Sequence, residues 1–198
     1  MIPVQFNRNV NGLYEKLCKI RVGIIGCGGL GSNVAISLAR SGVENFTICD
    51  FDKVEATNLN RQHFFLDDIG LYKVNAIEKY LKGINLNISL NKILLKIDSD
   101  NITGLFDNCD IIVEAVDLAE TKKTIIEYFM NFSDTPVISG SGISGYGQFE
   151  ELKIKKIANL YVCGDQTTDM SEGLCCPRIH IVANMQANLV IELLMKKF

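Results

Sequence analysis

The chain has 198 residues, of which 47% are hydrophobic and 22% are charged, and its formal net charge is −3 at pH 7. This composition is that of an ordinary folded protein and excludes a disordered chain. A pI near 5.4 provides no general positive field, so we expect no binding of nucleic acid. Residues 1–198 are expected to form a single domain, because this length lies within the usual range for one domain.

The stretch from Val22 to Ala39 carries no charge, but it contains five glycines together with Ser32, Asn33 and Ser37. We therefore expect it to form a strand, a turn and a helix rather than a membrane span. The first sixteen residues lack the uninterrupted apolar core of a signal peptide. These observations predict no membrane association and a cytoplasmic location.

The apolar pattern predicts strands that alternate with helices along most of the chain. Strands are expected at 21–25, 46–49, 88–97, 110–113 and 136–138, and helices at 30–41, 71–81 and 119–132. One or two antiparallel strands are expected within 149–161, followed by a helix at 179–198. The predicted fold class is therefore α/β and Rossmann-like, with a mostly parallel sheet, helices on both faces and antiparallel strands near the C-terminus.

The segment Gly26-Cys-Gly-Gly-Leu-Gly31 satisfies the pattern G-x-G-x-x-G between a predicted strand and a predicted helix. Glycines at this turn allow backbone N–H groups to approach a phosphate beside the start of the helix. Asp50 lies nineteen residues after Gly31, at the end of the next strand, where a carboxylate can accept hydrogen bonds from ribose hydroxyls. The candidate nucleotide-binding glycines are Gly26, Gly28, Gly29 and Gly31.

The segment from Asp50 to Gln62 is rich in polar residues, where a dehydrogenase usually continues into its next helix. It contains Arg61, and Lys73 follows at the start of the next predicted helix. Such residues can form ordinary surface salt bridges. Beside a phosphate-binding turn they also suit a clamp for a triphosphate. This pattern favours ATP, while an NAD(P)-dependent oxidoreductase stays open as the alternative.

These motifs resemble the signature of the ThiF/MoeB/HesA family, the ubiquitin-activating-type enzymes. The family pattern GxGGxGS, DxDxVxxSNLxRQ and GxxK is matched at residues 26–32, 50–62 and 70–73, with Thr57 in place of the usual Ser. The segment from Val113 to Asp117 resembles the family strand that ends in a metal-binding Asp. The match runs along nearly the whole chain, and it looks most similar to the short ThiF-like sulfur carrier protein adenylyltransferases of thiamine biosynthesis.

The resemblance implies ATP-dependent adenylation of the C-terminal Gly-Gly carboxylate of a ThiS-like, ubiquitin-fold sulfur carrier protein. It implies that Asp50 holds the ribose, with Asp52 in the same nucleotide site. Asn58, Arg61 and Lys73 are expected to contact the phosphates. The same chemistry could serve a carrier of the molybdopterin or cysteine pathway, and this alternative stays open.

Two further roles are implied by the resemblance. Asp117 is expected to bind Mg²⁺, and Arg8 is expected to enter the ATP site of the partner subunit in a homodimer. Asn9 stands beside Arg8 where many family members have Gln. The expected catalytic residues are thus Arg61, Lys73, Asp117 and Arg8, and the expected cofactors are ATP and Mg²⁺.

The chain has seven cysteines and no CxxC pair, so we expect no zinc site. Cys163 is a candidate for a covalent or sulfur-transfer step, as cysteines are in longer family members. The alternative is a buried thiol at the end of a strand. A reactive cysteine needs an exposed thiolate near positive charge, which the sequence does not reveal.

Overall fold

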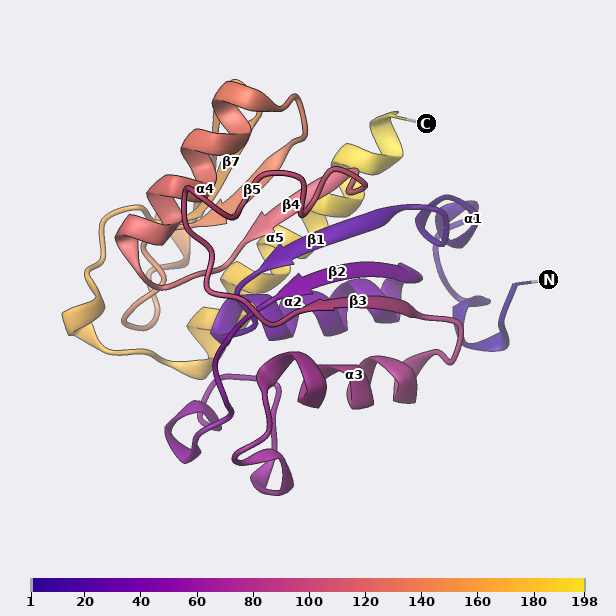
Figure 1. The fold of residues 1–198 in the computed structure, drawn as a ribbon, viewed down its shortest axis with the longest axis horizontal. Helices are drawn as coiled ribbons and strands as arrows, with labels where there is room; N and C mark the ends of the chain where they lie inside the picture. The colour runs from indigo at the N-terminus through magenta and orange to yellow at the C-terminus, as the bar shows by residue number, and fades with distance from the viewer. Residues whose placement is uncertain (1, 198) are drawn as a thin grey trace.

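Seven strands form one sheet in the order β3-β2-β1-β4-β5-β7-β6 in the computed structural model, which describes residues 2–197 (Figure 1). The strands are β1 (Arg21–Ile25), β2 (Asn45–Cys49), β3 (Ser89–Ile93), β4 (Ile111–Glu114), β5 (Val137–Gly140), β6 (Lys153–Ile157) and β7 (Leu160–Gly164). All neighbouring pairs are parallel except β6 and β7, which are antiparallel. This arrangement confirms the predicted Rossmann-like α/β fold.

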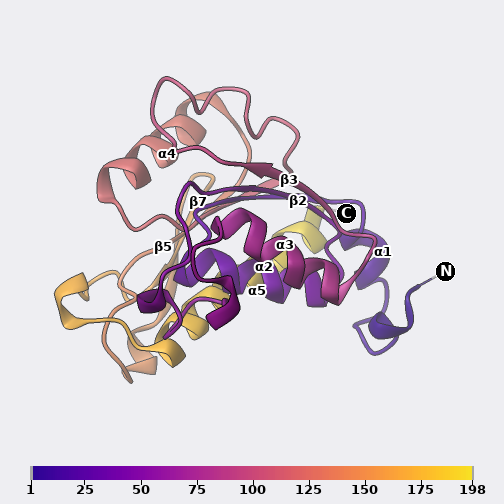
Figure 2. The same cartoon turned by 60° about the horizontal axis from the view of Figure 1, so that its bottom comes forward.

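Helices cover both faces of the sheet (Figure 2). One face carries α2 (Gly29–Ser41), α3 (Lys73–Ile84) and α5 (Cys176–Lys197), and the other carries α4 (Ala119–Phe132). The short helix α1 (Leu13–Leu17) precedes the first strand. No helix between residues 2 and 197 is long and apolar enough to cross a membrane.

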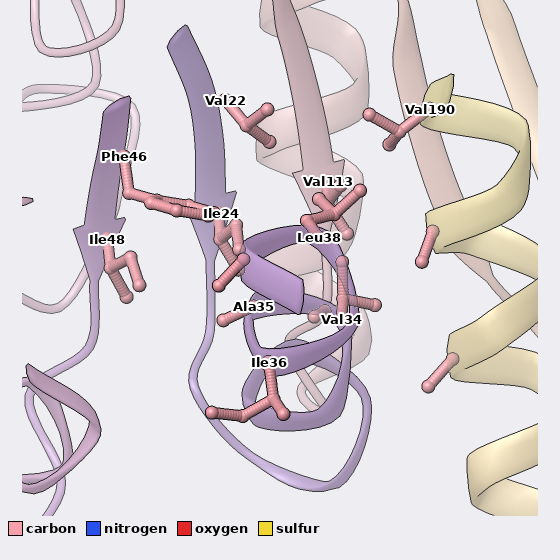
Figure 3. Close-up of a cluster of buried hydrophobic side chains, with 14 of the residues drawn as sticks. Val22, Ile24, Val34, Ala35, Ile36, Leu38, Phe46, Ile48, Val113 and Val190 are labelled. Atoms are coloured by element: carbon pink, nitrogen blue, oxygen red, sulfur yellow. The ribbon is translucent and has the colours of Figure 1, made fainter. Parts of the chain in front are cut away.

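The larger part of the core lies between the sheet and helices α2 and α5 (Figure 3). Strand residues such as Val22 and Ile24 contribute to it, and Leu38 of α2 is fully buried against them. Continuous apolar strands of this kind are typical of parallel sheets covered on both faces. Gly23 allows a close approach on the opposite face, where a Cβ would lie 2.6 Å from the Cδ1 atom of Ile112. This packing fixes the carboxyl ends of the parallel strands next to one another along one edge of the sheet.

The element boundaries differ from the prediction mainly near the C-terminus. The two C-terminal strands end later than predicted, at Gly164, and α5 begins three residues earlier than predicted, at Cys176. Pro177 fits this early start, because the fixed φ of proline is favourable in the first turn of a helix. Strand β3 is shorter than the predicted strand 88–97, and the chain from 94 to 110 runs without a regular element.

Candidate functional site

A cavity of about 360 Å³ opens at the carboxyl ends of the parallel strands. Its lining comes from the segments that follow β1, β2, β3, β4 and β5, and from the start of α2 and α3. The strand order reverses beside β1, with β2 and β3 on one side and β4 and β5 on the other. The crevice at such a reversal is where ligands bind in open α/β sheets.

The glycine turn lies at the edge of this cavity, and the structural reason for glycine differs from one position to the next. At Gly26, which has φ +93°, a Cβ would lie 2.6 Å from the backbone oxygen of Ala115, and at Gly31 it would lie 1.9 Å from the oxygen of Gly26. These two positions exclude a side chain because the protein packs against itself. A Cβ at Gly28 would meet nothing closer than the Gln62 amide at 3.7 Å, so this glycine leaves open the space beside the start of α2.

Asp50 connects the glycine turn to the end of β2. Its Oδ2 atom accepts a hydrogen bond of 2.6 Å from the Cys27 N–H, and Oδ1 accepts one of 2.7 Å from the Asp52 N–H. Burial raises the pKa of Asp50, while the charge of Lys73 and the two N–H donors oppose that rise. Each oxygen retains acceptor capacity, and the carboxylate lines the cavity, so it can accept hydrogen bonds from ligand hydroxyls.

Lys73 is the first residue of α3, and its side chain enters the cavity. Its Nζ lies 2.8 Å from Oδ2 of Asp52, and its backbone N–H donates to the Asp52 carbonyl at 2.9 Å. The Lys73 side chain is only 7% exposed, whereas that of Asp52 is 49% exposed. The ammonium group is therefore held in place by one partner and faces a space in which an anion can approach.

Arg61 lines the cavity from the polar loop after β2. Its aliphatic stem lies beside Gly29, and its Nη1 atom donates to the Thr57 carbonyl at 3.0 Å and to Oδ1 of Asn60 at 2.8 Å. The amide of Asn33 in α2 donates to the Arg61 carbonyl at 2.9 Å. These bonds tie the loop to α2, so that the cations Arg61 and Lys73 share one cavity with the glycine turn.

Asn58 shapes this loop and is not among the residues that line the cavity. Its Oδ1 atom accepts a hydrogen bond of 3.0 Å from the Glu55 N–H, which caps the 3₁₀ turn Ala56–Asn58. Its carbonyl accepts from the N–H groups of Arg61 and Gln62. In this conformation Asn58 therefore acts on the site through the loop that carries Arg61, and the expected phosphate contact stays a prediction.

Asp117 lies between β4 and α4, is exposed, and lines the cavity. No hydrogen bond to its carboxylate is formed within the described part of the chain. Residues 2–197 contain no group of three or more His, Cys, Asp or Glu side chains arranged around a metal ion. Mg²⁺ is commonly held by one or two carboxylates together with substrate phosphates and water, and an exposed Asp that lines the cavity fits that role.

Arg8 lies far from the cavity of its own chain. The amide of Asn9 donates to the Ser41 carbonyl at 2.9 Å, which places this segment at the end of α2 opposite to the glycine turn (Figure 1). A helix of 13 residues is about 20 Å long. Arg8 could therefore contribute only to the site of another subunit.

Cys163 is a fully buried residue of β7, opposite Gly140 of β5 and Ile154 of β6. Burial raises the pKa of its thiol to about 12. The thiol is thus protonated and closed off from other proteins in this conformation. This burial is what the alternative of a buried strand-end thiol expects, and a covalent role for Cys163 stays a prediction.

Gln62 and Lys122 are among the polar residues of the cavity that were not singled out from the sequence. Gln62 is buried, and its Oε1 atom has no hydrogen-bond partner within residues 2–197. Its position directly after Arg61 could have drawn attention to it. Lys122 also lines the cavity, and it forms an ion pair with Glu114. No local pattern indicates this pair, because it depends on how α4 packs against the sheet.

Comparison with known proteins places the chain in a family. The model of the ThiF family matches residues 4–197. The adenylyltransferase and sulfurtransferase UBA4 of Debaryomyces hansenii is 28% identical over 203 residues, covering 98% of this chain and 45% of that protein. The molybdopterin-synthase adenylyltransferase of Haemophilus influenzae is 33% identical over 135 residues, covering 68% of this chain and 55% of that protein. The chain thus spans about half the length of these two relatives.

The fold is also similar to that of solved structures. The E. coli tRNA N6-threonylcarbamoyladenosine dehydratase TcdA, crystallised in complex with ATP, has a TM-score of 0.86 at 17% identity. The similarity covers 94% of this chain and 90% of that one. At this identity the comparison shows the fold alone. Because the family model matches almost the entire chain, the chain belongs to the ThiF family.

Proposed function

We propose that this protein uses ATP and Mg²⁺ to adenylate the C-terminal Gly-Gly carboxylate of a ThiS-like sulfur carrier protein, a step of thiamine thiazole biosynthesis. The observation that carries the proposal is the cavity that Arg61 and Lys73 line together with the glycine turn. Relatives named as adenylyltransferases support the same class of reaction.

The cavity suggests how ATP would lie. Asp50 would accept the ribose hydroxyls, and the N–H groups at the start of α2 would face the phosphates. Lys73 and Arg61 would neutralise phosphate charge, with Asn58 supporting the loop that carries Arg61. Asp117 would hold Mg²⁺, which supplies charge neutralisation to the phosphates when it is bound.

The proposed reaction needs no nucleophile from the protein. An oxygen of the carrier carboxylate, already ionised at pH 7, attacks the α-phosphorus and forms the acyl-phosphate bond. The bond between the α-phosphorus and the oxygen that bridges to the β-phosphorus breaks, and pyrophosphate leaves with its electron pair. The protein has to align two anions and neutralise their charge, which is work that arginine and lysine suit.

The proposed assembly is a homodimer with two ATP sites. Arg8 lies at the far end of α2, so it can assist catalysis only if a second subunit presents it to the cavity. A two-fold dimer provides this arrangement twice.

A different ubiquitin-like carrier is the second candidate substrate. It is favoured by the similarity to molybdopterin-synthase adenylyltransferases, and a carrier of a cysteine pathway would require the same chemistry. An NAD(P)-dependent oxidoreductase is the less favoured alternative, because it gives no evident use to the two cations in the cavity.

The test is ATP–pyrophosphate exchange with Mg²⁺, measured with Gly-Gly-ending carriers and with the same carriers lacking the last two glycines. Exchange that requires an intact ThiS-like tail would support the proposal, and exchange with only a molybdopterin-type carrier would identify the second candidate. Binding of NAD(P) without binding of ATP would contradict both.

A further inference from the structure

A charge network lies beside the cavity, and Lys122 and Gly140 of this network line the cavity. Glu114, the last residue of β4, has no exposed surface, and its carboxylate forms an ion pair with Nζ of Lys122 in α4. The buried Ser139 hydroxyl donates to the same carboxylate oxygen at 2.6 Å. Nζ of Lys122 also donates to the Gly140 carbonyl at 3.2 Å and to the Ser139 hydroxyl at 3.5 Å. The network thus joins the ends of β4 and β5 to α4.

The same carboxylate holds the segment that leads to Asp117. Oε1 of Glu114 accepts a hydrogen bond of 2.8 Å from the Val116 N–H. The Ala115 N–H donates to the Ile25 carbonyl at 2.8 Å, which ties this segment to β1. The orientation of residues 115–118, and hence of Asp117, therefore depends on where the Glu114 carboxylate lies.

The charge of Glu114 would be unfavourable in this place without Lys122. A buried carboxylate whose partner is removed is strongly destabilised. Phosphates in the adjoining cavity would meet an additional negative charge in surroundings of low polarity. Lys122 neutralises the charge of Glu114, so that the pair adds no net negative charge beside the cavity.

We propose that Lys122 is a positioning residue of this site, which neutralises Glu114 and thereby holds Asp117 toward the bound nucleotide. Its ammonium group donates hydrogen bonds to Glu114, Ser139 and Gly140. Through these bonds Lys122, which also lines the cavity, acts on the site by way of Glu114. This inference rests on the proposed function as an ATP-dependent enzyme.

The experiment compares Lys122→Met and Lys122→Arg with the control Lys123→Met. Lys123 is the next residue of α4, and its pair with Glu127 at 3.7 Å lies on the surface. Affinity for a non-hydrolysable ATP analogue is measured by calorimetry across a Mg²⁺ titration, together with Tm and the Mg²⁺ dependence of exchange.

We expect Lys122→Met to bind the analogue at least about tenfold more weakly and to need more Mg²⁺ for half-maximal binding. Lys122→Arg should recover most of this loss, because the guanidinium group keeps the charge. Lys123→Met should match the wild type. A double variant, Lys122→Met with Glu114→Gln, should regain affinity relative to Lys122→Met, because no unpaired carboxylate is left.

Equal analogue affinity and Mg²⁺ dependence in wild type and Lys122→Met would overturn this inference alone. Affinity that stays low in the folded double variant would show that repulsion by Glu114 is not the cause, and would also overturn it. If Lys122→Met does not fold, the double variant and Lys122→Arg carry the comparison. A wild-type protein that binds no ATP analogue would instead contradict the proposed function, and this inference with it.

Discussion

Lys73 combines burial with an incomplete set of partners. Its ammonium group is almost enclosed by the protein, yet its carboxylate partner Asp52 is half exposed. Buried charges in proteins are normally paired, and a phosphate in the cavity would supply a second anion to this lysine. The residue is thus placed for charge neutralisation at the centre of the proposed reaction.

Lys73→Ala is expected to lower carrier-dependent ATP–pyrophosphate exchange by about 100-fold or more, because a cation aligned with the phosphates is lost. The fold should be retained, and thermal unfolding would check this. Lys196→Ala is the matched control, since Lys196 forms an exposed pair with Glu192 on α5. Normal exchange in Lys73→Ala would remove this residue from the mechanism.

Gly28 and Gly31 allow a second test at the level of single residues. Gly31→Ala should destabilise the protein by roughly 1–3 kcal/mol, because the new Cβ would lie 1.9 Å from the Gly26 oxygen. Gly28→Ala should leave Tm nearly unchanged and weaken ATP binding, because its Cβ would have space in the protein but would stand beside the bound phosphates. Urea unfolding and calorimetric titration with ATP separate the two effects. An unchanged ATP affinity in Gly28→Ala would contradict the proposed location of the phosphates.

At the scale of elements, a buried ion pair connects the loop after β5 to the loop after β7. Arg178 in the first turn of α5 pairs with Asp165 and donates to the Gly147 carbonyl at 2.7 Å. Asp165 also accepts hydrogen bonds from the backbone N–H and hydroxyl groups of Thr167 and Thr168. Both loops contribute residues to the cavity, so this pair holds its rim in one arrangement.

This arrangement predicts a dependence of stability on pH. Burial alone would raise the pKa of Asp165, but the N–H and hydroxyl donors of Thr168 and Thr167 hold it well below its usual range. The stabilisation that the ionised Asp165 contributes is therefore complete above the pKa of an Asp in the unfolded chain, about 3.9, and is lost as the pH falls below that value. Asp165→Asn should cost about 3–5 kcal/mol at pH 7.

The difference in unfolding free energy between wild type and Asp165→Asn should shrink as the pH falls from 5 toward 2.5. Urea unfolding of both proteins at each pH measures this difference, in which the titration of other groups largely cancels. A difference that stays constant across this range would show that ionisation of Asp165 is not the source of the stabilisation.

At the scale of the whole molecule, the position of Arg8 makes the proposed dimer testable. Neither Arg8→Ala nor Lys73→Ala should be active alone. In a heterodimer of the two variants, one site would combine an intact Lys73 with Arg8 from the other subunit. When equal amounts of the two variants exchange subunits at random, about a quarter of wild-type activity should return. Half of the dimers would then be mixed, and each mixed dimer would have one intact site out of two. The measurement is ATP–pyrophosphate exchange after the two variants are mixed. If activity does not recover although the subunits are proven to exchange, Arg8 has no role in the site of the partner subunit.

The sequence by itself determined the α/β order and the presence of a phosphate-binding turn. These features depend on local signals, namely apolar runs for strands, helical spacing for helices and glycines where the chain must turn sharply. Asp50 and Lys73 could be named because they stand next to an end of a predicted element, and Arg61 because it belongs to the polar loop between those elements. The structure brings all three to one cavity.

Only the tertiary structure decided how side chains distant in sequence act together. Asn58 caps a turn, Cys163 is closed in the sheet, and Arg8 lies a helix length away from the glycine turn. The pair of Glu114 and Lys122 likewise exists only because α4 packs against the ends of β4 and β5. The physical reason is that burial, charge pairing and distance belong to the packed chain, so the neighbours of a residue in sequence do not reveal them.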